Sequence, residues 1–175
     1  TEENDDLTLG GPPKAIVSAN ANAGFSIVEY EGTYPAEAKI PHGLSATPEL
    51  IIIKNLNDTS DWEVYHSATG NTGNLVLNDS AAFATNAGFM NDTSPTATVF
   101  TVGNDGYVNG VGDEHIAYCF HSVSGYSKIS SYTGTGSSHA ITGLGFQPDF
   151  VMIKETDGVD SWELYDSVRG ADKVL

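Results

Sequence analysis

Two short strings combine the carboxylates and aromatic rings best suited to chemistry. Trp62-Glu63-Val64-Tyr65 and Trp162-Glu163-Leu164-Tyr165 each place a glutamate beside a tryptophan. Glycoside hydrolysis requires two carboxylates that flank the scissile bond in a sugar-lined cleft. Each string supplies only one, on the opposite strand face from its tryptophan. We therefore predict that Glu63 and Glu163 cover a sheet face, and that the rings fill the core.

Nucleophilic catalysis has no better candidate. No Gly-x-Ser-x-Gly elbow occurs. Ser137-Ser138-His139 lies in a loop, and the matching earlier segment, Glu37-Ala38-Lys39, has neither residue type. Cys119, the single cysteine, sits in the apolar run Ile116–Phe120, which predicts a buried structural thiol. We expect no catalytic residue and a protein that is not an enzyme.

Acidic turn residues are the candidates for a metal site. The five histidines show no HxH or HExxH spacing, so zinc is not expected. Asp105, Asp113 and Glu114 flank turns, where carboxylates and backbone carbonyls can hold Ca²⁺, although no EF-hand pattern is present. The sequence predicts no cofactor, and the alternative is a structural calcium ion at these residues.

The charge of the chain excludes some partners. The chain has seven Lys and Arg residues and 23 Asp and Glu residues, which gives a net charge of −16. Nucleic acid is not an expected partner, because phosphate binding requires clustered basic residues. No apolar run approaches the roughly 20 residues of a membrane-spanning helix. Membrane insertion is therefore not expected either.

An internal repeat predicts the domain organisation. Residues 43–54 recur as residues 143–154, and residues 62–70 recur as residues 162–170, so both matches lie 100 positions apart. The repeat predicts three parts. These are an N-terminal linker or arm (1–23), a complete β-sandwich module (24–124), and the first half of a homologous module, truncated or completed by other chain segments (125–175).

Short apolar runs separated by turn residues indicate an all-β fold. Ile51–Ile53, 98–102 and 115–120 are typical of strands, and Gly103-Asn104-Asp105-Gly106 is a strong turn signal. Only Ser80–Asn86 favours a helical turn. About six to eight short strands in each module predict a two-sheet sandwich.

One loop-rich stretch, Asn86–Pro95, is the candidate surface for a partner. The residues expected to contact a partner are Phe89, Met90, Asn91 and Asp92.

Several motifs resemble the repeat modules of marine phage tail and tail-fibre-like proteins, over about residues 15–175. The most specific runs from Ile116-Ala117-Tyr118-Cys119-Phe120-His121-Ser122-Val123 to Gly125-Tyr126-Ser127-Lys128, and Gly145–Lys154 is similar to a module opening. Ser130-Ser131 departs from the pattern, where Phe-Gly is expected, which leaves the register there open. The resemblance implies a concanavalin- or laminin-G-like jelly roll without catalytic residues.

The resemblance also implies a place and partners. The expected function is a structural module of a virion appendage, a tail or tail fibre, that contacts other virion proteins, copies of itself, or a host-surface glycan. The alternative is a secreted or cell-surface lectin-like module that binds carbohydrate in the extracellular space. Sugar-specific binding distinguishes the lectin from the scaffold.

Overall fold

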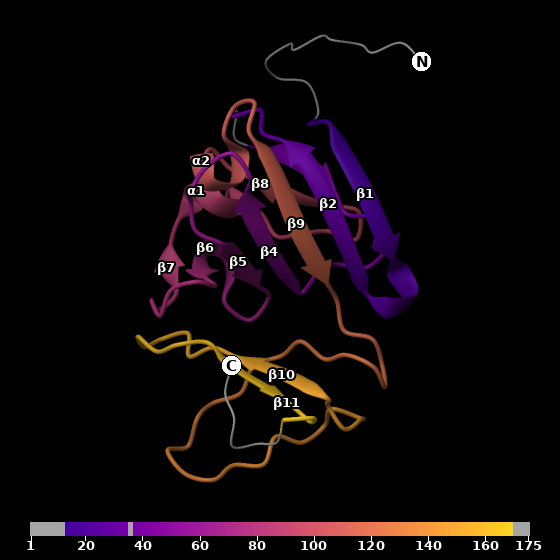
Figure 1. Ribbon diagram of the computed structural model, residues 1–175, viewed down its shortest axis with the longest axis vertical. Helices are drawn as coiled ribbons and strands as arrows, with labels where there is room; N and C mark the ends of the chain where they lie inside the picture. Colours follow the sequence, from indigo (N-terminus) through magenta and orange to yellow (C-terminus); the bar gives the residue numbers. More distant parts are fainter. Residues whose placement is uncertain (1–12, 35–36, 170–175) are drawn as a thin grey trace.

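A computed structural model describes residues 13–34 and 37–169. The regular structure is mostly antiparallel β-sheet, which confirms the all-β prediction and is consistent with a sandwich. The largest sheet has seven strands in the order β1-β2-β9-β4-β5-β6-β7, and β3–β8 and β10–β11 form two smaller sheets (Figure 1). The strands are β1 (Ala15–Asn20), β2 (Phe25–Glu31), β3 (Ala38–Pro41), β4 (Leu50–Asn55), β5 (Glu63–His66), β6 (Gly70–Val76), β7 (Ala84–Thr85), β8 (Val99–Val102), β9 (Glu114–Phe120), β10 (Phe150–Ile153) and β11 (Glu163–Asp166).

Strand β9 lies in the middle of the large sheet, although it comes last in the first module. It pairs with β2 on one side, where Ile27 lies opposite Tyr118, and with β4 on the other, where Ile52 lies opposite Tyr118. Alternate side chains of a strand point to opposite faces of the sheet. The large sheet therefore has an inner face, which packs on β3–β8, and an outer face.

The main core lies between the inner face of the large sheet and the layer behind it. Figure 1 shows β8 and two short helices, α1 (Ala87–Met90) and α2 (Gly106–Asn109), on that side. Cys119 faces this core, as predicted, and burial raises the pKa of its thiol to about 12. The core residues are Val28, Tyr30, Ala38, Ile40, Leu44, Ile51, Ile53, Tyr65, Phe89, Met90, Phe100, Val102, Val108, Ala117 and Cys119.

The helices do not lie where the sequence predicted one. The stretch Ser80–Asn86 contains the short strand β7 instead, and α1 begins after Asn86. The turn at residues 103–106 leads into α2, where the Asp105 carboxylate accepts a hydrogen bond from the backbone N–H of Tyr107 at 2.9 Å. None of the helices in the described ranges is long and apolar enough to cross a membrane.

The first strand extends the module further toward the N-terminus than predicted. Residues 1–23 were expected to form a linker or arm with a short edge strand. Residues 1–12 lie outside the described part. However, β1 pairs with β2 along its whole length, from Ala15 opposite Tyr30 to Asn20 opposite Phe25, and a 3₁₀ turn (η1, Ala21–Ala23) joins the two. Residues 15–20 therefore belong to the large sheet, and residues 21–23 form the turn that connects β1 to β2.

The C-terminal hairpin repeats a hairpin of the first module in register. In β4–β5, Leu50 pairs with His66 and Ile53 with Glu63. In β10–β11, Phe150 pairs with Asp166 and Ile153 with Glu163, so every partner is shifted by the same 100 positions. The same sequence pattern thus gives the same local pairing twice.

The rest of the second copy does not form the counterparts of β2 and β3. Within residues 125–149, all of which the structure describes, strand pairing is limited to one bridge, between Val123 and Ser127. In the first module β2 pairs with β9, and β3 pairs with β8. Residues 125–149 have no such partner strands among the described residues, so their backbone forms no ladder and lies in turns and bends.

The stretch predicted to contact a partner turns largely inward. Phe89 and Met90 are fully buried in the main core, so their assignment to a binding surface was wrong. The four-residue helix α1 directs both side chains between the two layers. Asn91 and Asp92 follow in the left-handed region (φ 52° and 46°), which Asn and Asp tolerate, and Asp92 is exposed.

Replacing Phe89 distinguishes a core side chain from a surface side chain. We expect Phe89→Ala to lower the free energy of unfolding by about 3–5 kcal/mol, because the change leaves a cavity in the core. The matched control is Phe150→Ala, at a side chain that is 55% exposed, where we expect about 0.5 kcal/mol or less. Urea unfolding measures both values. Equal costs for the two variants would contradict the packing described.

Candidate functional site

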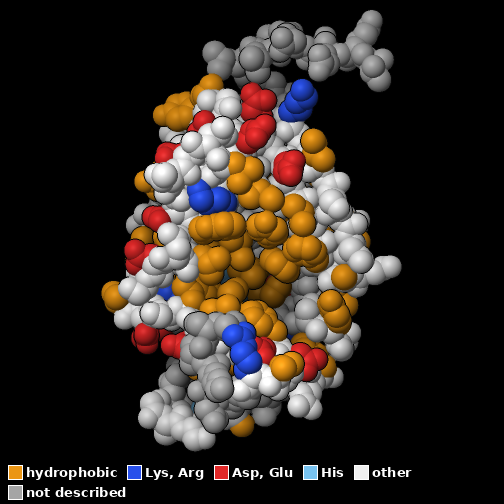
Figure 2. Space-filling view, in the orientation of Figure 1, with side chains coloured by type: hydrophobic (Ala, Val, Ile, Leu, Met, Phe, Trp, Pro, Cys, Tyr) orange, Lys and Arg blue, Asp and Glu red, His pale blue; other side chains and the backbone are white. Residues whose placement is uncertain are grey.

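The outer face of the large sheet carries large apolar side chains that are only partly buried. Ser26, Val28 and Tyr30 of β2 point into the core, so Phe25 and Ile27 point outward. The same alternation turns three further side chains of β4 and β9 outward: Ile52, Tyr118 and Phe120. Figure 2 shows a continuous hydrophobic area in the centre of the molecule.

Four aromatic rings form a row across this face. The ring centroids of Trp62 and Tyr118 are 6.3 Å apart, and those of Tyr118 and Phe25 are 6.5 Å apart with an interplanar angle of 6°. The centroid of Phe120 lies 4.8 Å from that of Phe25. We call this row, with Ile27 and Ile52, the aromatic face. Its rings offer apolar contact area and no reactive group, so it is suited to binding.

The C-terminal hairpin covers the part of the outer face next to the aromatic face. Leu50, Val64 and Leu75 form a second buried cluster, against which Met152 and Trp162 pack. In Figure 2 the hydrophobic area forms a hollow above the C-terminal segment. Ile52 and Phe120 pack against the same cluster, so the aromatic face adjoins the hairpin, and its six side chains remain partly exposed.

The prediction that the recurring rings fill the core holds for Tyr65 but not for Trp62. Tyr65 is 5% exposed and belongs to the main core. Trp62 is only partly buried, and it stacks on Tyr118 on the outer face. Because the two residues are three positions apart in a strand-like segment, they point to opposite sides of the sheet.

Glu63 faces the inner side of the sheet and is 3% exposed. Its carboxyl Oε2 accepts a hydrogen bond from the side-chain amide of Asn74. The pKa of Glu63 is raised to about 7, mainly by burial and also by the nearby carboxylates of Asp105 and Asp61, while the Asn74 hydrogen bond lowers it. The expectation that Glu63 covers a sheet face was correct in the sense that it covers the inner one.

The three calcium candidates do not form one site. Asp105 accepts a hydrogen bond from the Asn86 amide at 2.7 Å, and Asp113 accepts one from the Asn55 amide at 2.8 Å. Glu114 is exposed at the start of β9. Among the residues that the structure describes, no three His, Cys, Asp or Glu side chains converge on a position for a metal ion. The two aspartates instead accept hydrogen bonds that connect segments distant in the sequence.

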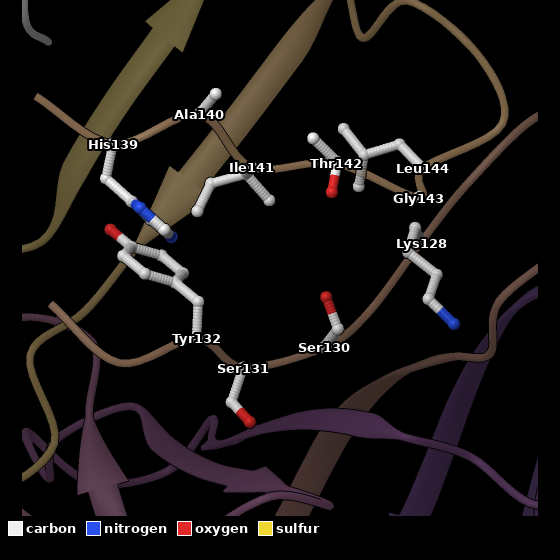
Figure 3. Close-up of a pocket in the computed structure, with 10 residues that line it drawn as sticks. All are labelled: Lys128, Ser130, Ser131, Tyr132, His139, Ala140, Ile141, Thr142, Gly143 and Leu144. Atoms are coloured by element: carbon white, nitrogen blue, oxygen red, sulfur yellow. The ribbon is translucent and has the colours of Figure 1, made fainter.

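The second copy contains a cavity, shown in Figure 3, that has a structural explanation. Its lining includes Tyr132 and Leu144, which match Tyr30 and Leu44 of the first module. Tyr30 and Leu44 are 3% and 1% exposed, whereas Tyr132 is 50% exposed. The cavity is therefore lined by residues whose counterparts lie in the core of the first module.

The cavity also contains residue types that nucleophilic catalysis uses. In Figure 3 the ring of His139 lies beside Tyr132, whereas the hydroxyl of Ser130 points into another part of the cavity. The hydroxyl of Thr135 donates to the backbone carbonyl of Ser137 at 3.1 Å and lies 3.4 Å from the Ser137 hydroxyl. The arrangement gives no reason to revise the prediction that Ser137-Ser138-His139 is a loop.

Sequence reasoning missed the aromatic face, although the signal was present. The alternate residues of β2 and β9 are apolar on both faces, as in Phe25-x-Ile27 and Tyr118-x-Phe120. A strand that is apolar on both faces requires a covering layer on each. The sequence predicted only one such layer for these strands.

The fold and this surface define an all-β module that presents an apolar, aromatic sheet face. The chain belongs to a family described as a domain of unknown function, DUF7483, whose pattern matches residues 8–175. No curated protein and no solved structure matches the chain.

The raised pKa of Glu63 predicts how the stability of the protein depends on pH. A carboxyl whose pKa is about 7 when folded and near 4.5 when unfolded destabilises the fold progressively as the pH rises between these values. We expect Glu63→Gln to match the parent near pH 4 and to exceed its free energy of unfolding by up to about 3 kcal/mol at pH 8.

Urea unfolding at the two pH values measures this difference, and Glu29→Gln, at an exposed position of β2, corrects for the loss of one surface carboxylate. A Glu63→Gln variant that is less stable than the parent at pH 8 would show that the charged form is the stabilising one.

Proposed function

We propose that the chain is a non-enzymatic structural module of a phage virion appendage, a tail or tail fibre, in which consecutive β-modules pack directly on one another. The observation that carries the proposal is the docking of the second copy against the first. A rigid joint between repeats is what an appendage under mechanical load requires, because flexible linkers leave neighbouring domains free to move.

The joint combines hydrogen bonds with apolar contact. The Trp162 indole N–H donates to the carbonyl of Val76 at 2.8 Å. The carbonyl of Ser80 accepts from the Lys154 ammonium at 3.2 Å and from the backbone N–H of Asp160 at 3.0 Å. The backbone N–H of Phe83 donates to the carbonyl of Thr156 at 2.9 Å.

Lys154 shows how a repeated residue is used differently at the joint. Its counterpart Lys54 donates to carbonyls of its own turn, at Asn55 and Asp58. Lys154 donates to Glu155 of its own turn and to Ser80 of the first module. The same side chain therefore stabilises a turn in one copy, and both a turn and the joint in the other.

The motifs that resemble phage tail modules and the acidic composition also support this function. A net charge of −16 keeps exposed protein in solution by self-repulsion. Antibodies against the chain should label the tail or its fibres on particles of the virus that encodes it, seen by negative-stain electron microscopy. Purified particles that lack the protein would contradict the proposal.

A substitution at the joint tests its rigidity. We expect Trp162→Ala to speed proteolysis within residues 124–149 severalfold, because the variant loses a hydrogen bond and a packed ring while the first module stays folded. Val168→Ala, at a side chain that is 93% exposed, is the matched control and should cleave like the parent. Limited proteolysis with mass spectrometry measures the rates, and unchanged rates in Trp162→Ala would mean that the joint does not depend on this ring.

A further inference from the structure

The aromatic face is a contiguous, partly exposed apolar surface on a strongly acidic protein. Cross-strand pairing arranges it in rungs. In the first rung Phe25 lies opposite Phe120, next to the covered Leu50, and in the second Ile27, Tyr118 and Ile52 lie side by side. Contiguous apolar surfaces of this kind on a soluble protein mark interaction sites.

The chain itself shows what this kind of surface binds. The hairpin that covers the adjoining cluster presents the repeat counterparts of the outer face, with Met152 in place of Ile52 and Trp162 in place of Trp62. Equivalent surfaces therefore meet within one chain. Contact between like surfaces is the principle of two-fold symmetric association, in which the same patch serves both partners.

The distribution of charge favours the same kind of partner. The third rung carries Glu29 and Lys54 on either side of Ile116, and Glu31 lies opposite Glu114 beyond it. The first two rungs carry no charged side chain on the outer side of β2, β9 and β4. Two copies that each carry −16 charges repel one another over most of their surfaces, and the aromatic face is where they approach at the lowest electrostatic cost.

We propose that the aromatic face binds the aromatic face of a second copy of this chain, forming a two-fold symmetric dimer. The contact buries the first two rungs of both copies and leaves the charged third rung at its margin. The dimer continues the interface that the C-terminal hairpin begins. It does not depend on the virion function proposed above, since a protein of any location associates through such a face.

Salt should strengthen this association. Added salt screens the repulsion between the two acidic copies, whereas it does not weaken the burial of apolar side chains. We expect the fraction of dimer to rise with ionic strength. An association carried by charge pairs would weaken instead.

Sedimentation velocity of the full chain over a range of protein and salt concentrations tests the proposal. We expect a species of twice the 18.5 kDa chain mass for the parent. Ile27→Glu, which places a charge in the middle of the aromatic face, should raise the dimer dissociation constant roughly tenfold or more. Val111→Glu is the matched control, at an exposed loop residue before β9, and should dimerise like the parent.

A second variant keeps the test decisive if Ile27→Glu does not fold. Phe25→Ser removes one partly exposed ring from the row without adding charge, and circular dichroism confirms that each variant retains its sheet. We expect this variant also to weaken the dimer.

Three outcomes would overturn the proposal. The first is a parent chain that stays monomeric at every concentration and salt level, and the second is a dimer that neither variant weakens. The third is glycan-array binding that is lost in Phe25→Ser while the parent stays monomeric, which would assign the aromatic face to a carbohydrate. Particle labelling and sedimentation are separate measurements, so either proposal can fail while the other stands.

Discussion

The pairing of β9 between β2 and β4 is the interaction on which the large sheet depends. The strand joins β1–β2 on one side to β4–β7 on the other, and neither group contacts the other through the sheet without it. Its inner residues, Ala117 and Cys119, lie in the main core, and its outer residues, Tyr118 and Phe120, lie in the aromatic face. The second copy illustrates the dependence. It forms the local hairpin β10–β11, while the segments that require distant partners form no ladder.

The sequence predicted the features that local patterns determine. The all-β class follows from short apolar runs between turn residues, and the equal register of β4–β5 and β10–β11 agrees with the repeat at 100 positions. It did not predict that Phe89 and Met90 enter the core, because residues 86–95 have no strand or helix period from which burial can be read. It also missed the aromatic face, although β2 and β9 carry apolar residues on both faces, because that pattern does not say which surface covers the second face.

A tryptophan side chain is usually more buried than a glutamate side chain, but Trp62 and Glu63 show the opposite arrangement. The tryptophan lies on the outer face and the carboxyl lies inside, where the Asn74 amide and a raised pKa reduce the cost of burial. A partly exposed tryptophan ring is stabilised by contact with another surface. Trp162, the repeat counterpart of Trp62, has such a contact with the first module. The reversal at Trp62 therefore agrees with a surface built for contact.

The matching hairpins also bear on how the nascent chain acquires its shape. A hairpin such as β4–β5 closes a loop of a few residues and can form while the following residues are still on the ribosome, whereas β2 must wait for β9, about ninety positions later. Until then the apolar rungs of β2 and β4 have no neighbour between them. Because β9 ends at Phe120, the large sheet can close before the β10–β11 hairpin is made, and its outer face is then available for that hairpin to pack on.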